Sequence, residues 1–414
     1  MLRLNHLIQN SLDHVSLPDE ITHLSEFSSD CQKEKEAIMS RIVILGCGVV
    51  GRHMAIDLCK DPNYDVVSVD INRVALEHLA SEYPVQIRVE DLSTVEGVIR
   101  AVEDADIVIG SVPYSIGYAM LENVIRAGKN IVDISYFSED PFDLDALAKE
   151  KGVTAVVDCG VVPGMGSIIL GDHARKMKVI RYECYVGGIP KSRNAPLGYK
   201  SPFPVLEVLE EYAESGSMVE DGKVVVRPML SETMTIDFDK VGTLACLNSD
   251  GLRTLIRTMN IPNMFEKTLR YPEHVDLMRI FRDTGLLNMP PIQVDGVSVR
   301  PIDVTASLLS PLWKYEPGDA DITVMRLVIS GDEDGKPSTY TYDMYDEYDS
   351  VTGALSMART TGYTCTAVTR LVLDGVFSQK GIIPPEFVGR VDGCWKDIER
   401  YLDDRGVHLK MQRS

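Results

Sequence analysis

The sequence predicts an α/β protein in which a doubly wound parallel sheet is followed by a second, α+β domain with a largely antiparallel sheet. From residue 39 to residue 160, short apolar runs alternate with helical patterns, as parallel strands joined by helical crossovers require. From residue 179 onward, apolar residues recur with a period of two, which is typical of half-buried antiparallel strands. A glycine-rich turn after the first apolar run indicates a ligand-binding site in the parallel sheet.

The chain divides into four predicted segments. Residues 1–38 are expected to be an N-terminal tail outside the fold, and they lack the continuous apolar run of a secretory signal peptide. Residues 39–160 contain the parallel sheet, residues 161–352 form the second domain, and residues 353–414 are helices that return to the first domain.

The first predicted strand, Ile42–Leu45, is a short β-branched run of the kind found in fully buried parallel strands. It ends in the turn Gly46-Cys47-Gly48-Val49-Val50-Gly51, which leads into a helix. Gly46 makes the tight turn, Gly48 lets the backbone approach a diphosphate, and Gly51 lets the helix pack closely on the strand. The free N–H groups at the start of the helix bind phosphate oxygens. The turn therefore predicts a Rossmann-type dinucleotide site.

The second strand, Asp65–Asp70, ends in an acid 24 positions after Gly46, where a carboxylate binds the ribose 2′-hydroxyl. Ile71 and Asn72 follow it and are expected to lie beside the cofactor. A carboxylate at this place repels a 2′-phosphate, so NAD is favoured over NADP. Arg73 would partly offset that charge, although a solvated helix face is the simpler role for it.

The alternation of helices and strands continues to residue 158. Pro84 ends the next helix, and Asp91, after the third strand, is expected either to contact the adenine or to cap the following helix. The predicted elements are a helix at Asn72–Tyr83, strands at Val85–Val89 and Asp106–Ser111, a helix at Ser115–Ala127, and strands at Asn130–Asp133 and Val153–Asp158.

Three of these strand ends are expected to face the cofactor, because ligands of doubly wound sheets bind beyond the carboxyl ends of the strands. They are Ser111-Val112-Pro113, Asp133-Ile134 and Asp158-Cys159-Gly160. The Asp158 carboxylate would either hold a substrate ammonium group or cap the helix that follows.

The second domain is predicted as an open sheet, covered by helices on one face, with a free face or edge for homodimerisation or higher homo-oligomerisation. Its period-two segments are Val179–Val186, Glu232–Phe238, Ile322–Ile329 and Thr339–Tyr345, the last two joined through Gly331–Lys336. Irregular stretches are expected at Gly187–Pro204, Asp221–Lys223 and Pro290–Pro291. After Gly353 only helices are expected, at Leu355–Val376 and Trp395–Arg405.

Composition restricts the class of partner. The formal net charge of −20, with no basic stripe, argues against nucleic acid and anionic membranes. No apolar run approaches the roughly 20 residues of a membrane span. The eight cysteines are scattered without metal-ligand spacing, so we expect reduced thiols, no metal site and a cytoplasmic protein.

Several motifs together resemble the saccharopine dehydrogenase-like NAD(P) oxidoreductases over residues 39–410. They are Gly46–Gly51, Asp158–Gly164, Gly187–Pro190, Pro196–Lys200, Lys267–His274 and Met357–Tyr363, with Glu273 standing where a glycine is expected. The resemblance implies a two-domain dehydrogenase with an amino-acid substrate between its domains. Within the family the resemblance is nearest to lysine 6-dehydrogenase, which forms 2-aminoadipate 6-semialdehyde that cyclises to piperideine-6-carboxylate.

The implied reaction assigns roles to five residues. The amine must lose a proton before hydride leaves, and His274 is the candidate base because its ordinary pKa lies near neutrality; the alternative is a core or surface histidine. Arg270 or Lys200 would bind the substrate carboxylate, and Asp158 would bind an ammonium group. Tyr199 would orient the substrate or simply pack.

Two other readings remain open. Within the same class, the chain would be a saccharopine reductase or a carboxynorspermidine dehydrogenase-like enzyme, and a substrate with three carboxylates would require more cations in the cleft than lysine does. In a different class, it would be a non-catalytic NAD-binding sensor, which would keep the glycine turn without convergent acids and bases.

Overall fold

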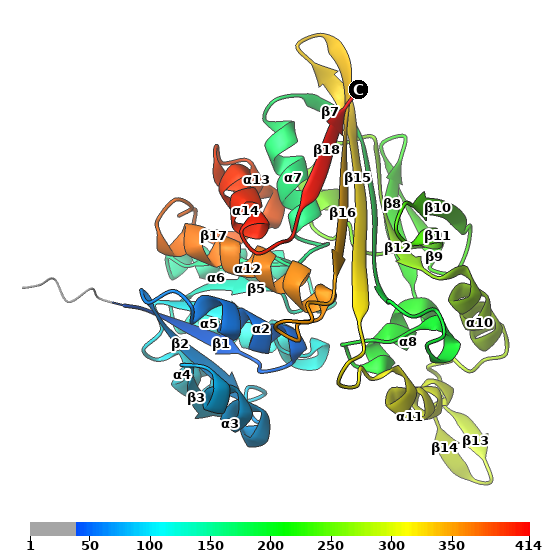
Figure 1. Ribbon diagram of the computed structural model, residues 1–414, viewed down its shortest axis with the longest axis horizontal. Helices are drawn as coiled ribbons and strands as arrows, with labels where there is room; N and C mark the ends of the chain where they lie inside the picture. The colour runs from blue at the N-terminus through cyan, green and yellow to red at the C-terminus, as the bar shows by residue number, and fades with distance from the viewer. Residues whose placement is uncertain (1–38) are drawn as a thin grey trace, which may run out of the picture. The chain divides into compact units, whose positions relative to one another are not determined.

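The first sheet has seven parallel strands in the order β17-β6-β5-β4-β1-β2-β3 (Figure 1). A computed structural model describes residues 39–414, and the predicted tail lies outside the described residues. The doubly wound parallel sheet is confirmed. Its strands are β1 (Ser40–Leu45), β2 (Tyr64–Asp70), β3 (Gln86–Val89), β4 (Ile107–Gly110), β5 (Asn130–Asp133), β6 (Thr154–Val156) and β17 (Gly381–Ile383).

Both faces of this sheet are buried, because alternate residues of β1 enter two different cores. Ile42 and Ile44 pack beneath one layer of helices, and Val43 and Leu45 beneath the other. The first layer contains α2 (Val49–Leu58), α3 (Arg73–Glu82) and α12 (Ser356–Leu373); the second contains α4 (Val95–Val102), α5 (Tyr114–Arg126) and α6 (Asp145–Glu150), which follows a 3₁₀ turn, η2 (Pro141–Leu144).

The second sheet is mixed, in the order β10-β11-β12-β7-β15-β16-β18, with β8 and β9 attached beside β12. β12 runs parallel to β7, and the other pairs are antiparallel. The predicted hairpin of β15 with β16 is confirmed. The strands are β7 (Lys178–Pro190), β8 (Ser215–Glu220), β9 (Lys223–Pro228), β10 (Met234–Phe238), β11 (Gly242–Asn248), β12 (Asn263–Arg270), β15 (Asp321–Glu333), β16 (Lys336–Glu347) and β18 (Leu409–Arg413).

Two expectations were wrong. Strands do follow residue 353: β17 completes the first sheet and β18 pairs with β16. β17 has three residues and β18 five, so neither is long enough to show a clear period. Gly187–Pro190 is not irregular but forms the end of β7. A Cβ on Gly187 would lie 2.5 Å from the Leu269 carbonyl oxygen. The glycines of this segment therefore mark a close approach within a sheet and not a loop.

Helices cover one face of the second sheet and form a third apolar cluster around Trp313. α7 (Met165–Ala174) and α12 pack on β15 (Figure 1). The remaining elements are η3 (Pro196–Gly198), α8 (Val205–Ala213), α9 (Leu255–Thr258), α10 (Pro272–Asp283), α11 (Pro301–Trp313), α13 (Pro385–Gly389), α14 (Cys394–Asp403) and the hairpin β13 (Ile292–Val294) and β14 (Val297–Val299).

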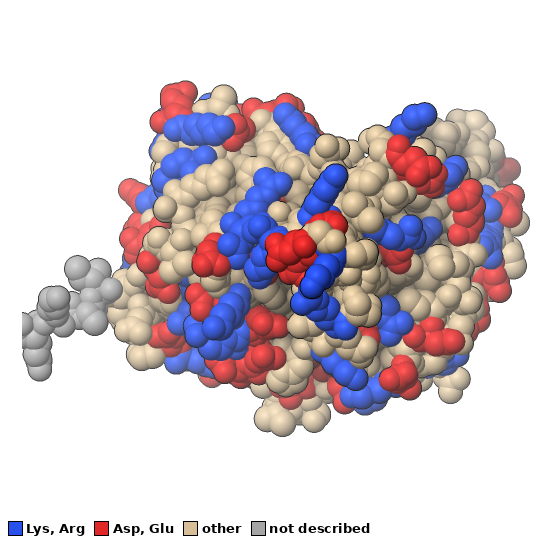
Figure 2. All heavy atoms as spheres, turned by 90° about the horizontal axis from the view of Figure 1, so that it is seen from above, with Lys and Arg blue, Asp and Glu red and all other residues tan. Residues whose placement is uncertain are grey.

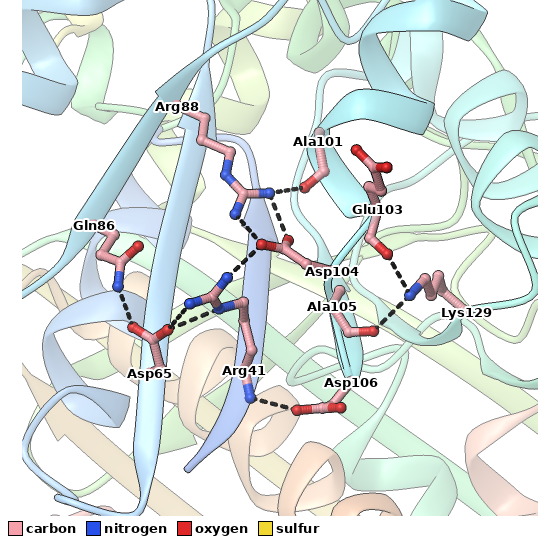
Figure 3. Close-up of polar contacts among 10 residues, drawn as sticks. All are labelled: Arg41, Asp65, Gln86, Arg88, Ala101, Glu103, Asp104, Ala105, Asp106 and Lys129. Carbon is pink, nitrogen blue, oxygen red and sulfur yellow. Dashed lines mark hydrogen bonds and ion pairs between the residues drawn. The ribbon is translucent and has the colours of Figure 1, made fainter. Parts of the chain in front are cut away.

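The amino end of the parallel sheet is held by a network of ion pairs (Figure 3). The Arg41 guanidinium bonds Asp65, with Nε 2.7 Å from Oδ2, and also contacts Asp104. Arg88 donates two hydrogen bonds of 2.8 and 2.7 Å to Asp104. These arginines hold the pKa of Asp104 well below its usual range. The network joins β1, β2 and β3 to the turn before β4.

The surface carries both signs of charge. On the face drawn in Figure 2, lysine and arginine side chains are interspersed with aspartate and glutamate. Among residues 39–414, no helix is long and apolar enough to cross a membrane. The same part of the chain contains no group of three or more His, Cys, Asp or Glu side chains placed to hold a metal ion.

Candidate active site

The glycine turn between β1 and α2 has the geometry that a dinucleotide diphosphate requires. Gly46 has φ +105°, and a Cβ there would lie 2.0 Å from the Ser111 carbonyl oxygen. A Cβ on Gly51 would lie 2.0 Å from the Gly46 carbonyl oxygen. A Cβ on Gly48 would meet nothing within 4 Å, so this position opens onto free space. No side chain caps the start of α2, which leaves its first N–H groups for a phosphate.

Asp70, at the end of β2, stabilises this turn by hydrogen bonds. Its carboxylate accepts hydrogen bonds of 2.7 Å from the Cys47 N–H and 2.8 Å from the Asn72 N–H. Binding of a ribose 2′-hydroxyl by this carboxylate stays a prediction. Ile71 beside it is 68% exposed, and the Asn72 side chain caps α3.

Asp91, which was expected either to contact adenine or to cap a helix, bonds within its own turn, and its contact with adenine stays a prediction. Its carboxylate accepts from the N–H and the hydroxyl of Ser93, at 3.0 and 2.6 Å. The helix cap is Thr94, whose hydroxyl accepts from the Gly97 N–H. The alternative of an N-cap role for Asp91 was therefore wrong by three residues.

The residues that follow β4, β5 and β6 form a buried layer and an exposed layer at this end of the sheet. Val112, Asp133 and Cys159 are buried, whereas Ser111 and Ile134 are half-buried and Pro113 is exposed. Burial raises the pKa of Asp133 to about 7, and its carboxylate accepts a 2.9 Å bond from the Ser135 N–H. Val112, Asp133, Cys159 and Gly160, which is also buried, thus support the surface, and the other three line it.

Two tyrosines that the sequence analysis did not single out lie at this end of the sheet. Tyr114 and Tyr136 are 37% and 43% exposed, and their rings stack with centroids 5.9 Å apart. Exposed rings beside a glycine turn are suited to hold a flat heterocycle. Alternating apolar residues locate strands, but they do not mark such exposed rings in the loops that follow.

Arg253 joins the second domain to the end of β6. The side chains of Arg253 and Asp158 are 9% and 2% exposed, and the Arg253 Nε lies 3.2 Å from Asp158 Oδ2. Nη1 donates a 2.9 Å bond to the Phe137 carbonyl, and the guanidinium lies 4.4 Å from the Tyr136 ring centroid. Nη2 is 3.2 Å from Asp158 Oδ1 but makes no hydrogen bond within the described residues. Asp158 is therefore paired, and Arg253 retains a donor.

The charges of second-domain carboxylates reach this region. Asp250 and Glu211 are half-buried, and Asp250 accepts a 3.2 Å bond from the Ser217 N–H. Partial loss of hydration raises the pKa of Tyr136 to about 12, and the charges of Asp250, Glu214 and Glu211 add to the rise while Arg253 opposes it. These acids of the second domain thus lie close to the exposed ring of the first.

Glu266 on β12 is a buried acid of the same region. It is 4% exposed, and its carboxyl group accepts a 3.2 Å bond from the Ser249 hydroxyl. Burial raises the pKa of Glu266 to about 8, with Glu211, Asp250 and Asp158 adding to the rise. The group is accordingly protonated near neutral pH.

His274, Arg270 and Tyr199 come together, but in a closed aromatic cluster with Tyr212 and Trp313. His274 is 0% exposed, and burial lowers its pKa to about 3. Its Nδ1 lies 2.9 Å from the Leu197 carbonyl oxygen and its Nε2 2.9 Å from the Tyr212 hydroxyl, so neither ring nitrogen is free. Arg270 donates a 3.0 Å bond to the same hydroxyl and lies over the Tyr199 ring. This arrangement favours the alternative reading of His274, a core histidine.

Lys200 lies apart from Asp158, beside a cavity of the second domain. Its Nζ pairs with Asp319 at 2.6 Å and donates to the Lys314 carbonyl at 2.9 Å. It lines a cavity of ≈ 520 Å³ together with Lys191 and Asn194, where Lys191 pairs with Glu347 at 2.7 Å. Both cations of this cavity are thus already paired.

Comparison with known families identifies two matching profiles. The one described as "Saccharopine dehydrogenase NADP binding domain" matches residues 42–156, and the one described as "Saccharopine dehydrogenase C-terminal domain" matches residues 156–405.

Several known proteins are similar to this chain. Saccharopine dehydrogenase [NADP(+), L-glutamate-forming] of Pyricularia oryzae is 23% identical, over 83% of this chain and 93% of that protein. The Saccharomyces cerevisiae enzyme of that name is 23% identical, over 89% of this chain and 98% of that protein. The bovine mitochondrial alpha-aminoadipic semialdehyde synthase is 22% identical, over 88% of this chain and 47% of that protein. An apo structure of the Saccharomyces cerevisiae saccharopine dehydrogenase (L-Glu forming) has the same fold, with a TM-score of 0.74, 20% identity, and coverage of 91% of this chain and 100% of that one.

Proposed function

The chain belongs to the saccharopine dehydrogenase family of nicotinamide-dependent oxidoreductases acting on the CH–NH group of amino acids, and from this premise we propose that it is a lysine 6-dehydrogenase. The product would be 2-aminoadipate 6-semialdehyde, which cyclises to piperideine-6-carboxylate. The observation that carries the proposal is the charge balance at the carboxyl end of the parallel sheet. There the second domain presents Asp250, Glu211 and Glu214 near Tyr136, with Arg253 as the opposing cation.

This balance fits an amine better than a tricarboxylate. Saccharopine carries three carboxylates, each of which requires a cation or several hydrogen-bond donors. The segment after β11 supplies Arg253 and Arg257, and these are paired with Asp158 and with Asp140, the second pair at 2.7 Å. Lysine has one carboxylate and two ammonium groups, so it matches one arginine and several acids.

We assign the following roles to the residues of the site. Arg253 binds the substrate carboxylate through its guanidinium, whose Nη2 makes no hydrogen bond but is buried beside Asp158, so the side chain must shift to reach a ligand. Glu211 and Asp250 attract the ammonium group, and one of these carboxylates takes its proton. When bound, the nicotinamide cofactor accepts the hydride from the carbon. Tyr114 and Tyr136 lie beside that carbon while hydride is transferred. Water then attacks the resulting imine, supplies the aldehyde oxygen and releases ammonia.

For the cofactor we propose NAD, on the strength of Asp70. Its carboxylate is held at the end of β2 by two backbone N–H groups, and a negative charge there disfavours a 2′-phosphate. The names of the matching family profile and of the two fungal relatives, which specify NADP, favour the other nucleotide. The ratio of kcat/KM for NAD and NADP decides between them. A homo-oligomeric state and a cytoplasmic location complete the proposal.

The test is to incubate the purified full chain with NAD or NADP and, separately, lysine, saccharopine, carboxynorspermidine and a series of diamines, while following absorbance of the reduced nicotinamide. Turnover of lysine at least about tenfold above the other substrates, in kcat/KM, supports the proposal. Faster turnover of saccharopine would overturn it in favour of the saccharopine enzyme. Binding of the nucleotide without turnover of any of these substrates would favour a sensor.

A further inference from the structure

A buried acid, Glu386, holds the segment that carries Arg253, and the proposed reaction does not use it. Glu386 lies in the first turn of α13, shortly after β17 of the first sheet, and is 0% exposed. Its carboxyl group accepts a 3.2 Å hydrogen bond from the Thr254 hydroxyl and a second hydrogen bond from the Thr258 hydroxyl. Thr254 follows Arg253 in the chain, and Thr258 ends α9 one turn later. One carboxyl group of the first domain thus binds two hydroxyls of the second.

Glu386 is itself fixed beside Asp158. β17 pairs with β6, with Ile383 opposite Val156, so Glu386 and Asp158 follow the ends of two adjacent strands. A Cβ on Gly171 of α7 would lie 2.1 Å from the Glu386 carbonyl oxygen, so α7 and α13 pack closely at this residue. The backbone of Glu386 therefore has little freedom to move relative to the first sheet.

The carboxyl group has lost its hydration and depends on the two hydroxyls. Burial raises the pKa of Glu386 to about 7, and the hydrogen bonds from Thr258 and Thr254 oppose this rise. Buried polar groups are costly unless they are hydrogen-bonded, so the pairing of Glu386 with these threonines determines where the segment lies.

Both members of the Arg253–Asp158 pair have a left-handed backbone, which residues other than glycine rarely adopt. φ is 45° at Arg253 and 51° at Asp158. Such a conformation is unfavourable and persists only where the surrounding contacts hold it. For Arg253 these contacts include the bonds of its guanidinium to Asp158 and to the Phe137 carbonyl, and the bond of the next residue, Thr254, to Glu386.

Substrate binding as proposed above removes part of this support. The Arg253 guanidinium is buried against Asp158, so it must leave this carboxylate when it binds that of the substrate. The bonds to Glu386 come from the neighbouring threonines and not from the guanidinium, so they persist while the arginine shifts.

We propose that Glu386 is a positioning residue for substrate binding. Through two threonine hydroxyls it keeps the backbone of Arg253 in place while the guanidinium moves from Asp158 to the substrate carboxylate. This rests on the proposed role of Arg253, and Glu386 itself touches neither substrate nor cofactor. Without these bonds the arginine would hold the carboxylate less well, which raises KM, whereas hydride transfer and therefore kcat would be unchanged.

The test compares Glu386→Leu, Glu386→Gln and the double variant Thr254→Val with Thr258→Val in the full chain. The substrate is whichever amino acid of the panel above is turned over fastest. Glu386→Leu and the double variant should each raise its KM at least about tenfold, with kcat and the KM for the nucleotide within about twofold. Glu386→Gln should restore most of the wild-type KM, because an amide can accept from one hydroxyl and donate to the other.

A double-mutant cycle with Arg253→Lys shows whether Glu386 acts through the arginine. In the Arg253→Lys background, Glu386→Leu should raise KM by no more than about threefold. Fully additive effects of the two substitutions would overturn the proposal.

The matched control is Thr369→Val, which removes the hydroxyl of another buried threonine. Thr369 is 0% exposed, and its hydroxyl donates to the Cys365 carbonyl oxygen of its own helix, α12. This variant should lose thermal stability without any change in KM. Circular dichroism establishes that each variant is folded, and the double threonine variant provides the test if Glu386→Leu does not fold.

Hydrogen exchange gives a readout that needs no turnover. The Thr258 and Met259 amides bond within α9, and Glu386→Leu should speed their exchange at least about tenfold, whereas Thr369→Val should not. The proposed function is judged by which amino acid is turned over, and the role of Glu386 by the changes in KM and in exchange, so the two fail separately. An unchanged KM, a fall in kcat in place of a rise in KM, or unchanged exchange in Glu386→Leu would each overturn the proposal.

Discussion

Within residues 39–414, polar groups are paired with one another at the amino end of the parallel sheet, and some are left unpaired at its carboxyl end. At the amino end, Arg41, Asp65, Arg88 and Asp104 form a closed network in which each charge has an opposite neighbour (Figure 3). At the carboxyl end, the start of α2 has uncapped N–H groups, Gly48 opens onto free space, and two tyrosine rings are exposed.

The comparison shows that density of charge is a poor guide to the binding site. A satisfied network stabilises the strands it joins, and it has no capacity left for a ligand. Binding requires donors without partners and apolar surface that water still contacts. The Arg253–Asp158 pair lies between these cases, because Nη2 of its arginine makes no hydrogen bond although it is buried.

The largest expected effect comes from filling the open position of the turn, with Gly48→Leu. Gly48 has φ −70°, which any residue adopts, so the fold should tolerate the change while the side chain occupies the place of the diphosphate. The dissociation constant of NAD should rise roughly 100-fold or more, the loss of several charge-assisted hydrogen bonds. Calorimetric titration measures it.

The control for this change is Gly46→Leu, where φ is +105° and the backbone of Ser111 leaves no room. That variant should lose thermal stability as well as affinity. If Gly48→Leu bound NAD as tightly as the wild type, the carboxyl end would lose its assignment as the dinucleotide site.

The next prediction tests whether the aromatic cluster around His274 takes part in catalysis or only in stability. His274→Ala should lower the free energy of unfolding by about 3 kcal/mol, since it opens a cavity and leaves the Tyr212 hydroxyl with one partner fewer. The pH profile of kcat should keep its shape, because a ring whose two nitrogens are engaged takes no substrate proton. Denaturant titration and a kcat profile from pH 6 to pH 10 provide the two readouts. Loss of the acidic limb of the profile together with a large fall in kcat, at unchanged stability, would restore His274 as the base.

Arg253→Lys tests the role of the guanidinium. A lysine keeps the charge beside Asp158 but cannot present the fork of a guanidinium. We expect kcat/KM for lysine to fall about 30-fold, chiefly through KM, while KM for NAD is unchanged. Arg257→Lys is the matched control, because Arg257 is an exposed arginine of the same segment and pairs with Asp140. Equal, small effects of the two substitutions would remove Arg253 from substrate binding.

The pH dependence of stability should also depend on Glu266. Its folded-state pKa of about 8 lies above the unfolded value, so the folded state holds a proton that the unfolded state has lost above about pH 5. The free energy of unfolding should therefore fall as the pH rises from about 5 to 8. Glu266→Gln should flatten this slope and be more stable at pH 8 by roughly 2 kcal/mol. The exposed Glu150→Gln should leave the slope unchanged.

The smallest effect belongs to the amino end. Asp104 has a lowered pKa, so its contribution is present at neutral pH and is lost as the pH falls below about 4. Its side chain is 42% exposed and the pairs are screened, so Asp104→Asn should lower the free energy of unfolding by about 1 kcal/mol at most. The kcat/KM should not change. A loss of activity would show that the amino end also affects the site.

The regular part of the fold was predictable because its signals are local. The apolar run Ile42–Leu45, the glycine turn and the hairpin of β15 with β16 each lie within a few residues, and each is present as predicted. The parallel pairing of β12 with β7 could not be predicted from the sequence. The two strands lie about 80 residues apart, and each shows alternating apolar residues over only a short stretch.

The candidate site was harder to predict for the same reason. Asp158 was selected because it ends a strand, but its partner Arg253 lies 95 residues later in a turn with no periodic signal. His274 was selected on its ordinary pKa, and three-dimensional burial reversed that value. Residue type alone predicted neither the Arg253 pair nor the closed cluster, because both depend on which loops converge.

The position of β17 has a consequence for synthesis. The six strands β1–β6 leave the ribosome within the first 156 residues, but their neighbour on the outer side of β6 is not translated until residue 383. Until then the nascent chain exposes the N–H and carbonyl groups of β6, a template for wrong pairing. Ribosome-bound chains ending before Gly381 should remain protease-sensitive at β6, and those in which Ile383 has cleared the exit tunnel should become resistant.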